Sequence, residues 1–337
     1  ALLTALSIAG PASLAAASSR PHSLPARQVA AASASPVVGM RAGTLRRPGT
    51  ARRVEPTSAA DHPAADGLPT VSGGFGKTPS ISFPSSSPPT TLVSRVLDRG
   101  DGPDVRKGDL IAVNYTGQIW KGKVFDSTFL AKFDHQTPFA TEIGAGQVVA
   151  GWDDGIPGTR VGSRLLLVLP PKWGYGKSGA PKAGISGSDT LVFVIDVLGT
   201  WGKDATAGVG ARQVTDHHDG ITVTGALGAQ PQIRVASSAP QPKTEVQTLL
   251  ERGDGPAVTD GLLVYEETVT SWSGKVLDST WQQTCPTDAS FDSASKPSNP
   301  LAGVPLGSRV LIETPKSSSQ GGPYVFVLDL VADLAIP

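Results

Sequence analysis

The chain has 337 residues, a length that suggests two domains with unstructured extensions. Its hydrophobic content of 39% can form a core, while 39 glycines and 29 prolines favour turns and short strands over long helices. Basic and acidic residues both number 29, so no net charge attracts the chain to nucleic acid or to an anionic membrane. The single cysteine, Cys285, excludes an internal disulfide and a multi-cysteine metal site, and we expect it to be partly buried.

Residues 1–17 have the pattern of a truncated secretion signal. A short apolar run is followed by Ala15-Ala16-Ala17, which fits the small-residue rule of a cleavage site. The run is shorter than the ~20 apolar residues that span a bilayer, so we expect export to the cell envelope or exterior without stable membrane insertion. Residues 18–66 are rich in Ala, Pro, Ser and Arg and are expected to be disordered, because they can bury little apolar surface.

Short strands dominate the predicted structure that follows. Alternating apolar residues and turn signals predict six strands in the first half, at residues 91–97, 110–116, 124–127, 139–143, 164–169 and 191–197. Gly117 is expected to break the second of these strands, with a turn at residues 121–123. One short helix is predicted over residues 148–155, ended by Pro157. Together they predict an α+β domain in which an antiparallel sheet wraps around the helix.

The second half repeats the first in the same order. Residues 96–103, 123–128, 162–164 and 192–196 recur as 249–256, 275–280, 307–309 and 325–329. This order predicts a tandem duplication, with a first domain at residues 67–202, a linker at 203–219 and a second domain at 220–337.

Aromatic residues recur at positions that a single sheet would bring together. Tyr115, Phe125 and Asp126 fall on two adjacent predicted strands, and core packing is the simpler interpretation of that trio taken alone. Trp152 shares a helix face with Val148 and Val149, a face expected to pack on the sheet. Tyr175 follows a sharp turn and precedes a Gly-rich flap at residues 177–188. Loop aromatics above a sheet more often bind a ligand than stabilise a fold, which favours a binding pocket.

Other chemistries find little support in the sequence. His217-His218 could bind a metal weakly, but an exposed polar turn is the favoured interpretation because no matching ligand cluster occurs elsewhere. There is no complete Gly-x-x-x-x-Gly-Lys-Ser phosphate loop, no Gly-x-Ser-x-Gly nucleophile motif and no basic-aromatic stack suited to nucleic acid.

The ordered motifs resemble those of the FKBP-type peptidyl-prolyl isomerases. They are Tyr115-Thr116-Gly117, Phe125-Asp126-Ser127, Pro138-Phe139, Val148-Val149-Ala150-Gly151-Trp152, Gly174-Tyr175-Gly176 and Leu191-Val192-Phe193. The double-domain layout is similar to that of exported actinobacterial members. The resemblance implies a half-barrel with an apolar cavity for a proline side chain. Its floor would be Trp152, and its walls Tyr115, Phe125, Phe139, Val148, Val149 and Phe193.

The same resemblance assigns polar roles and partners. Tyr175 and the Val149 N–H would donate hydrogen bonds to a substrate carbonyl, Asp126 would lie beside the twisting amide, and Ile185 of the flap would contact substrate. Transfer of an X-Pro bond into an apolar pocket penalises the dipolar planar amide relative to the twisted one, so no nucleophile or cofactor is needed. The implied partners are proline-containing polypeptides and macrolide immunosuppressants, with sequence preference and macrolide affinity affected by Thr141 and the flap around Ala180. We expect a monomer.

The second copy departs from the motifs. Glu267 and Leu277 stand where the first copy has Tyr115 and Phe125, although Asp278 is retained. Residues 296–300 replace the Gly-Trp-Asp helix motif, and residues 317–322 replace the Gly-Tyr-Gly loop. We therefore expect a second domain that keeps its sheet and lacks activity. Two other functions stay open: a non-catalytic peptide-binding module or holdase chaperone, and a scaffold whose second domain contacts a partner.

Overall fold

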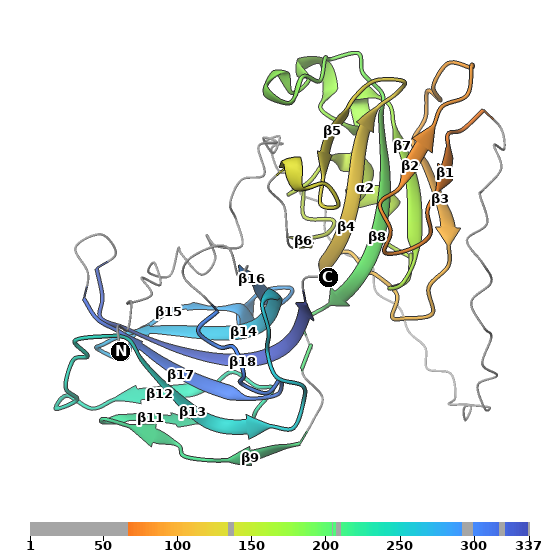
Figure 1. The fold of residues 1–337 in the computed structure, drawn as a ribbon. Coiled ribbons are helices and arrows are strands. Elements are labelled where there is room, and N and C mark those ends of the chain that lie inside the picture. Colours follow the sequence, from red (N-terminus) through yellow and green to blue (C-terminus); the bar gives the residue numbers. More distant parts are fainter. Residues whose placement is uncertain are drawn as a thin grey trace, which may run out of the picture.

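The structure is a computed structural model that describes residues 67–133, 138–203, 205–206, 210–291, 299–316 and 321–335. Two antiparallel sheets form the framework of the described residues, one in each half of the chain (Figure 1). Within the described ranges, no helix is long and apolar enough to cross a membrane. The expectations for residues 1–17 and 18–66 lie outside the described residues.

The first sheet has six strands in the order β3-β7-β8-β4-β5, with β6 paired to β4. They are β3 (Val93–Asp98), β4 (Leu110–Ile119), β5 (Val124–Ser127), β6 (Phe139–Glu142), β7 (Arg164–Leu169) and β8 (Leu191–Trp201). All six strand predictions are confirmed, although β4 and β8 run further than expected. Short 3-10 turns complete this half: η1 (Ala131–Phe133), η2 (Pro171–Trp173), η3 (Gly176–Ser178) and η4 (Pro181–Ala183).

The prediction that Gly117 breaks its strand is wrong. β4 continues through Gly117, which pairs with Asp126 on β5 and with Phe193 on β8. A Cβ at this position would lie 2.6 Å from the Phe125 ring and 2.9 Å from the Phe193 ring. Gly117 therefore admits two aromatic rings to the face of the sheet, a use of strand glycine that a turn signal does not distinguish.

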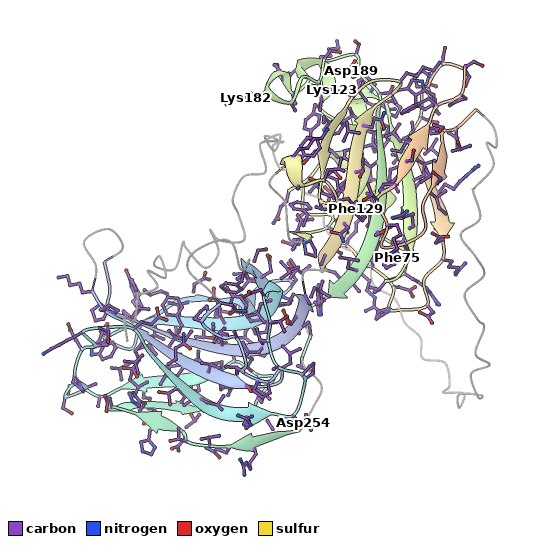
Figure 2. The ribbon with its side chains drawn as sticks, viewed as in Figure 1. Phe75, Lys123, Phe129, Lys182, Asp189 and Asp254 are labelled. Carbon is purple, nitrogen blue, oxygen red and sulfur yellow. The ribbon has the colours of Figure 1, made fainter. Side chains whose placement is uncertain are left out.

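Both faces of the first sheet are covered, as the full burial of β7 shows. Its residues alternate between two cores: Leu165, Leu167 and Leu169 pack toward the helix, and Leu166 and Val168 pack toward β1 (Thr70–Ser72) and β2 (Ser80–Ser82). Side chains fill the space on both sides of the strands (Figure 2). A sheet covered on both faces explains why this strand reads as a continuous apolar run.

The helix α2 spans Ala150–Gly155 and begins two residues later than predicted. Val149 is its N-cap, with the extended backbone angles φ −62° and ψ 141°. Gly151 faces the sheet, where an added Cβ would lie 2.4 Å from the Leu169 side chain. The absence of a side chain at Gly151 thus lets the helix lie directly on β7 and sets the position of Trp152.

The second sheet repeats the strand order of the first as β13-β17-β18-β14-β15, with β16 paired to β14 and β9 added beside β13. Its strands are β9 (Ala211–Gln213), β13 (Val246–Gly253), β14 (Gly261–Ser271), β15 (Val276–Ser279), β16 (Thr287–Phe291), β17 (Arg309–Thr314) and β18 (Tyr324–Ala335). A small sheet of β10 (His217–His218), β11 (Ile221–Thr224) and β12 (Gln232–Val235) accompanies it, and η5 spans Thr280–Gln282. No α-helix occurs among the described residues after 220.

Part of the expected linker is structured. β9 and β10 both lie within residues 203–219 and pair with strands of the second half. The polar turn expected at His217-His218 is instead β10, in which His218 Nδ1 lies 2.6 Å from Glu313 Oε1. Because β9 pairs with β13 and β10 pairs with β11, these residues belong to the structure of the second half, which therefore begins before residue 220.

A buried ion pair links each sheet to the chain that precedes it. The Arg164 guanidinium donates from Nε to Asp196 Oδ1 at 2.6 Å and from Nη2 to Asp196 Oδ2 at 2.8 Å. It also donates to the carbonyls of Gly73 and Lys77, between β1 and β2. All donors that face the interior thus have acceptors, as a fully buried charge requires.

The second half contains the same arrangement. Arg309 donates to Asp329 at 2.6 and 2.8 Å and to the carbonyls of Gly225 and Ala229. Elsewhere in this half, Cys285 is buried in a small apolar cluster that includes Leu110 and Trp201, which confirms the expectation for that residue. Burial raises the pKa of its thiol to about 12, so the side chain is an unreactive apolar group.

Candidate active site

Four aromatic side chains come together on the helix-facing side of the first sheet. Tyr115 comes from β4, Phe125 from β5, Phe193 from β8 and Trp152 from α2. Their side chains share one core with Ile185 of the flap, and the four rings are at most 8% exposed. The sequence prediction that these residues converge is confirmed.

The rings form a continuous edge-to-face assembly around Trp152. Its ring centroid lies 5.2 Å from that of Tyr115, 5.3 Å from Phe193 and 6.0 Å from Phe139. Phe125 joins through Phe193 at 5.6 Å, with an interplanar angle of 85°. Edge-to-face contacts of this kind hold aromatic rings in fixed orientations, so the indole presents a defined apolar surface.

Tyr115 and Asp126 form the polar part of this assembly. The Tyr115 hydroxyl donates to Asp126 Oδ2 at 2.6 Å, and the Ser127 N–H donates to Asp126 Oδ1 at 2.9 Å. Burial, followed by the charge of Asp126, raises the pKa of Tyr115 well above its usual value, so the phenol stays protonated. Asp126 is 7% exposed, and this pair fixes its carboxylate at the edge of the aromatic rings.

Besides the buried Trp152 Nε1, two hydrogen-bond donors at the edge of the site have no protein acceptor in the described part of the chain. The Tyr175 hydroxyl makes no hydrogen bond there, and burial, followed by the charge of Asp126, raises its pKa, so it remains a donor. The Val149 N–H at the start of α2 likewise meets no acceptor within these residues. Free donors beside an apolar surface are suited to a ligand carbonyl.

The remaining predicted residues surround the aromatic floor. Phe139, Val148, Val149 and Tyr175 are half-buried and pack against the aromatic core from its rim. Ile185 is 2% exposed and is held in the flap by two backbone hydrogen bonds with Ala180. The structure therefore brings all ten predicted residues to one face of the sheet, with the most polar of them at the edge.

Two supporting residues escaped the sequence analysis. Gly117 makes room for the Phe125 and Phe193 rings, and Thr128 accepts the Tyr115 N–H at 2.9 Å. A glycine inside a strand of alternating polarity is itself a signal of close approach and could have identified the first. The second depends on the register between β4 and the residues after β5, which local sequence does not encode.

The corresponding face of the second half has a different composition. The Glu267 N–H donates to Thr280 Oγ1 at 2.8 Å, as the Tyr115 N–H does to Thr128, so Glu267 occupies the position of Tyr115. Burial, reinforced by Asp278 and Glu266, raises the pKa of Glu267 to about 8. Leu277 is 41% exposed, whereas Phe125 in the equivalent strand is buried. The aromatic assembly is not repeated in the described residues of this half.

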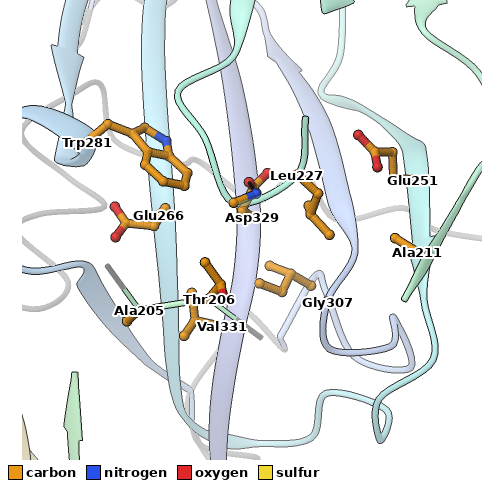
Figure 3. Close-up of a pocket in the computed structure, with 12 residues that line it drawn as sticks. Ala205, Thr206, Ala211, Leu227, Glu251, Glu266, Trp281, Gly307, Asp329 and Val331 are labelled. Carbon is orange, nitrogen blue, oxygen red and sulfur yellow. Dashed lines mark hydrogen bonds between the residues drawn. The ribbon is translucent and has the colours of Figure 1, made fainter. Parts of the chain in front are cut away.

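A cavity of about 310 Å³ lies on the other face of the second sheet (Figure 3). Glu266, Trp281 and Val331 are among its lining residues, and burial raises the pKa of Glu266 to about 7. Glu266 and Glu267 are adjacent on β14, so their side chains point to opposite faces. None of the predicted site residues lines this cavity, which is separate from the aromatic site.

Comparison with known proteins identifies the first half. The family model of FKBP-type peptidyl-prolyl cis-trans isomerase matches residues 102–198. An FK506-binding protein of Streptomyces anulatus is 37% identical over 36% of this chain and 94% of its own length. FK506-binding protein 1A of Aspergillus fumigatus is 40% identical over 32% of this chain and 91% of its own length. The crystal structure of AtFKBP13 has 36% identity and a TM-score of 0.29, and covers 33% of this chain and 94% of that structure. The chain therefore belongs to the FKBP-type peptidyl-prolyl cis-trans isomerases.

Proposed function

We propose that, among the described residues, the aromatic face of the first half is the single isomerase centre and that it acts on X-Pro bonds of exported proteins. Trp152 forms the floor for the proline ring, and the rings of Tyr115, Phe125 and Phe193 form its walls. Phe139, Val148 and Val149 complete these walls, and Ile185 of the flap contacts the substrate. The observation that carries the proposal is the pair of unused donors, Tyr175 and the Val149 N–H, beside a buried aromatic floor.

The proposed chemistry follows from the resonance of the amide. Rotation about a peptide bond has a barrier of ~18–20 kcal/mol because the planar form has partial double-bond character. An apolar floor disfavours the dipolar planar amide, while donors fixed at its edge can follow the carbonyl as it turns. A thousandfold acceleration requires about 4 kcal/mol, which desolvation and two hydrogen bonds can supply.

Asp126 acts through its position in this proposal. Its carboxylate lies at the edge of the floor, held by the Tyr115 hydroxyl and the Ser127 N–H. By accepting the Tyr115 hydroxyl, the carboxylate keeps that ring against Trp152 and so preserves the apolar wall beside the twisting amide.

The second half is proposed to be an inactive copy of the same domain. Its sheet has the same strand order, the same Arg–Asp pair and the same Thr–Ser contact between β14 and β15 as between β4 and β5. A carboxyl at Glu267 and an exposed Leu277 stand where an aromatic floor needs rings. Export is proposed from the apolar run and the Ala15–Ala17 site, which lie outside the described residues.

The test is an isomerase assay on the full chain with two matched tryptophan variants. We expect Trp152→Leu to lower kcat/KM at least tenfold, because it removes the floor, and Trp281→Leu in the second half to leave it unchanged. Equal effects of the two variants would contradict a single centre in the first half. Suppression of aggregation without acceleration of X-Pro rotation would instead support a holdase.

A further inference from the structure

Five lysines lie on two loops next to the aromatic site. The turn between β4 and β5 and the loop at residues 170–190 together carry five lysines and one aspartate. The lysines are all exposed: Lys121, Lys123, Lys172, Lys177 and Lys182. The whole chain has a formal net charge of zero, so this excess of positive charge is a local property of the site.

Two of the five lysines already have partners. Lys121 donates to the carbonyls of Ser85 and Ser86 at 2.7 and 3.1 Å, and Lys172 lies 5.4 Å from the centre of the Trp173 ring. Asp189, the aspartate of this region, accepts the Ser186 N–H at 2.7 Å.

The side-chain ammonium groups of the other three lysines make no ion pair or hydrogen bond within the described residues. These lysines are Lys123, Lys177 and Lys182, and they are called the rim lysines below. The negative charges nearest to them in sequence are Asp126, which is buried against Tyr115, and Asp189, which is held by its own loop.

The rim lysines lie beside residues of the site. Lys177 follows Tyr175 by two residues and is the middle residue of η3. Lys182 is in η4, between Ala180 and Ile185, whose side chains are buried in the aromatic core. Lys123 reaches the same flap from the sheet, because a Cβ on Gly184 would lie 2.4 Å from its Nζ. Figure 2 shows Lys123 and Lys182 at the same end of the first sheet, together with Asp189.

We propose that the rim lysines select X-Pro segments that carry acidic side chains within about two residues of the proline. An extended peptide advances ~3.3 Å per residue, so side chains at those positions lie within reach of the rim while the proline lies on Trp152. Exposed ion pairs are individually weak and screened by salt, so the selection acts mainly on KM and on the rate of encounter. This inference rests on the proposed function of the same site.

The experiment measures isomerisation by the full chain of three peptides with a single Leu-Pro bond. They differ only in carrying Glu, Gln or Lys at the residue before Leu and at the residue after Pro. At low ionic strength we expect kcat/KM to be about three- to tenfold higher for the Glu peptide than for the Gln peptide, and lowest for the Lys peptide. In ~0.5 M NaCl the three values should converge, because the Debye length is then only a few ångströms.

Three variants test whether the preference depends on the rim lysines or on the charge of the whole protein. The triple variant Lys123→Gln, Lys177→Gln, Lys182→Gln should reduce the ratio of Glu to Gln peptide to within about twofold of unity. The same lysines changed to Glu should reverse the preference toward the Lys peptide. The control variant is Lys107→Gln. Lys107 lies near the opposite end of the ten-residue strand β4 and pairs with Asp154 at 3.0 Å. This variant should keep the preference for the Glu peptide.

The outcomes distinguish this inference from the function on which it rests. Absence of acceleration for every peptide would overturn the proposed isomerase centre. Acceleration without a Glu preference at low salt, or a preference that survives in the triple variant, would overturn the rim inference alone. A circular dichroism spectrum of each variant that matches the original chain excludes misfolding as the cause of a lost preference.

Discussion

Tyr115 and Asp126 are linked by a 2.6 Å hydrogen bond in a site that water barely reaches. Asp126→Leu would leave a buried hydroxyl without its acceptor, and we expect it to lower the free energy of unfolding by about 1–3 kcal/mol. Tyr115→Phe should cost a similar amount, because Asp126 then loses a donor. The double variant should cost less than the sum of the two single changes, as measured by denaturant unfolding. Strict additivity would contradict the pairing.

Tyr175 offers the opposite case, a hydroxyl with no acceptor in the described residues. Its removal in Tyr175→Phe should leave stability within about 0.5 kcal/mol of the original chain. Loss of a hydrogen bond made to the turning carbonyl should lower kcat/KM about tenfold, the equivalent of ~1.4 kcal/mol. An unchanged kcat/KM in the isomerase assay would show that this hydroxyl does not serve the reaction.

The protonation of the same phenol gives a pH prediction. Burial raises the pKa of Tyr175 above its ordinary value near 10, so the hydroxyl remains a donor throughout the neutral and mildly alkaline range. We expect kcat/KM to show no loss from Tyr175 ionisation up to about pH 10. A fall near pH 9 that is absent in Tyr175→Phe would contradict this protonation state.

At the scale of elements, the contact between α2 and β7 positions the floor of the site. A Cβ at Gly151 would lie 2.4 Å from Leu169, so Gly151→Ala must displace the helix or the leucine. Overpacking of this kind costs about 1–3 kcal/mol, and we expect that loss together with reduced isomerase activity as Trp152 moves. Gly74→Ala is the matched control, because a Cβ there meets nothing within 4 Å and should change stability little. Denaturant unfolding of both variants measures the difference.

The elements of the first half were largely predictable from its sequence. Short apolar runs separated by Gly and Pro define strands well, and the bounds of β5 and β7 agree with the prediction. The helix bound was less accurate, because Val149 has apolar character yet an extended backbone as the N-cap. Gly117 was misassigned because the same residue type serves turns and close ring contacts, and only the partner strands decide between them.

The aromatic residues of the candidate site could be predicted from sequence, because they occur in a recognisable order along the chain. Sequence alone could not place the Tyr115 to Asp126 hydrogen bond or the free donors, because both depend on strand register and on what the flap leaves unpaired. The structured part of the linker was missed for a similar reason: β9 becomes a strand only by pairing with β13.

At the scale of the whole molecule, the two halves should respond differently to pH. Burial raises the pKa of Glu267 to about 8 and that of Glu266 to about 7, whereas both lie near 4.3 in an unfolded chain. Between these values the folded state holds more protons than the unfolded state, so stability falls as pH rises. The stabilisation is fully present below about pH 4 and is lost as pH passes through 7 and 8. Each group lowers the free energy of unfolding by at most ~1.4 kcal/mol per pH unit.

The measurement is calorimetric unfolding of the full chain between pH 5 and pH 9. Glu267→Gln should raise the Tm of the second half at pH 8 and flatten its pH dependence, because an amide cannot ionise. Asp254→Asn, at an exposed position of the same half, should do neither. A Tm of the second half that rises from pH 5 to pH 8 would contradict these protonation states.

The buried Arg164 guanidinium bears on how much chain ahead of the sheet the isomerase domain needs in order to be stable. The match to the family model starts at residue 102, yet two of the acceptors of this guanidinium are the carbonyls of Gly73 and Lys77. A chain cut at the family boundary would keep the charge and lose those acceptors, and would also uncover the apolar face that Val71 helps to seal. Uncompensated buried charge costs several kcal/mol, comparable to the whole stability of a small domain. A chain that keeps Arg164 fully paired therefore includes Gly73, 29 residues ahead of the start of the family-model match (102 − 73).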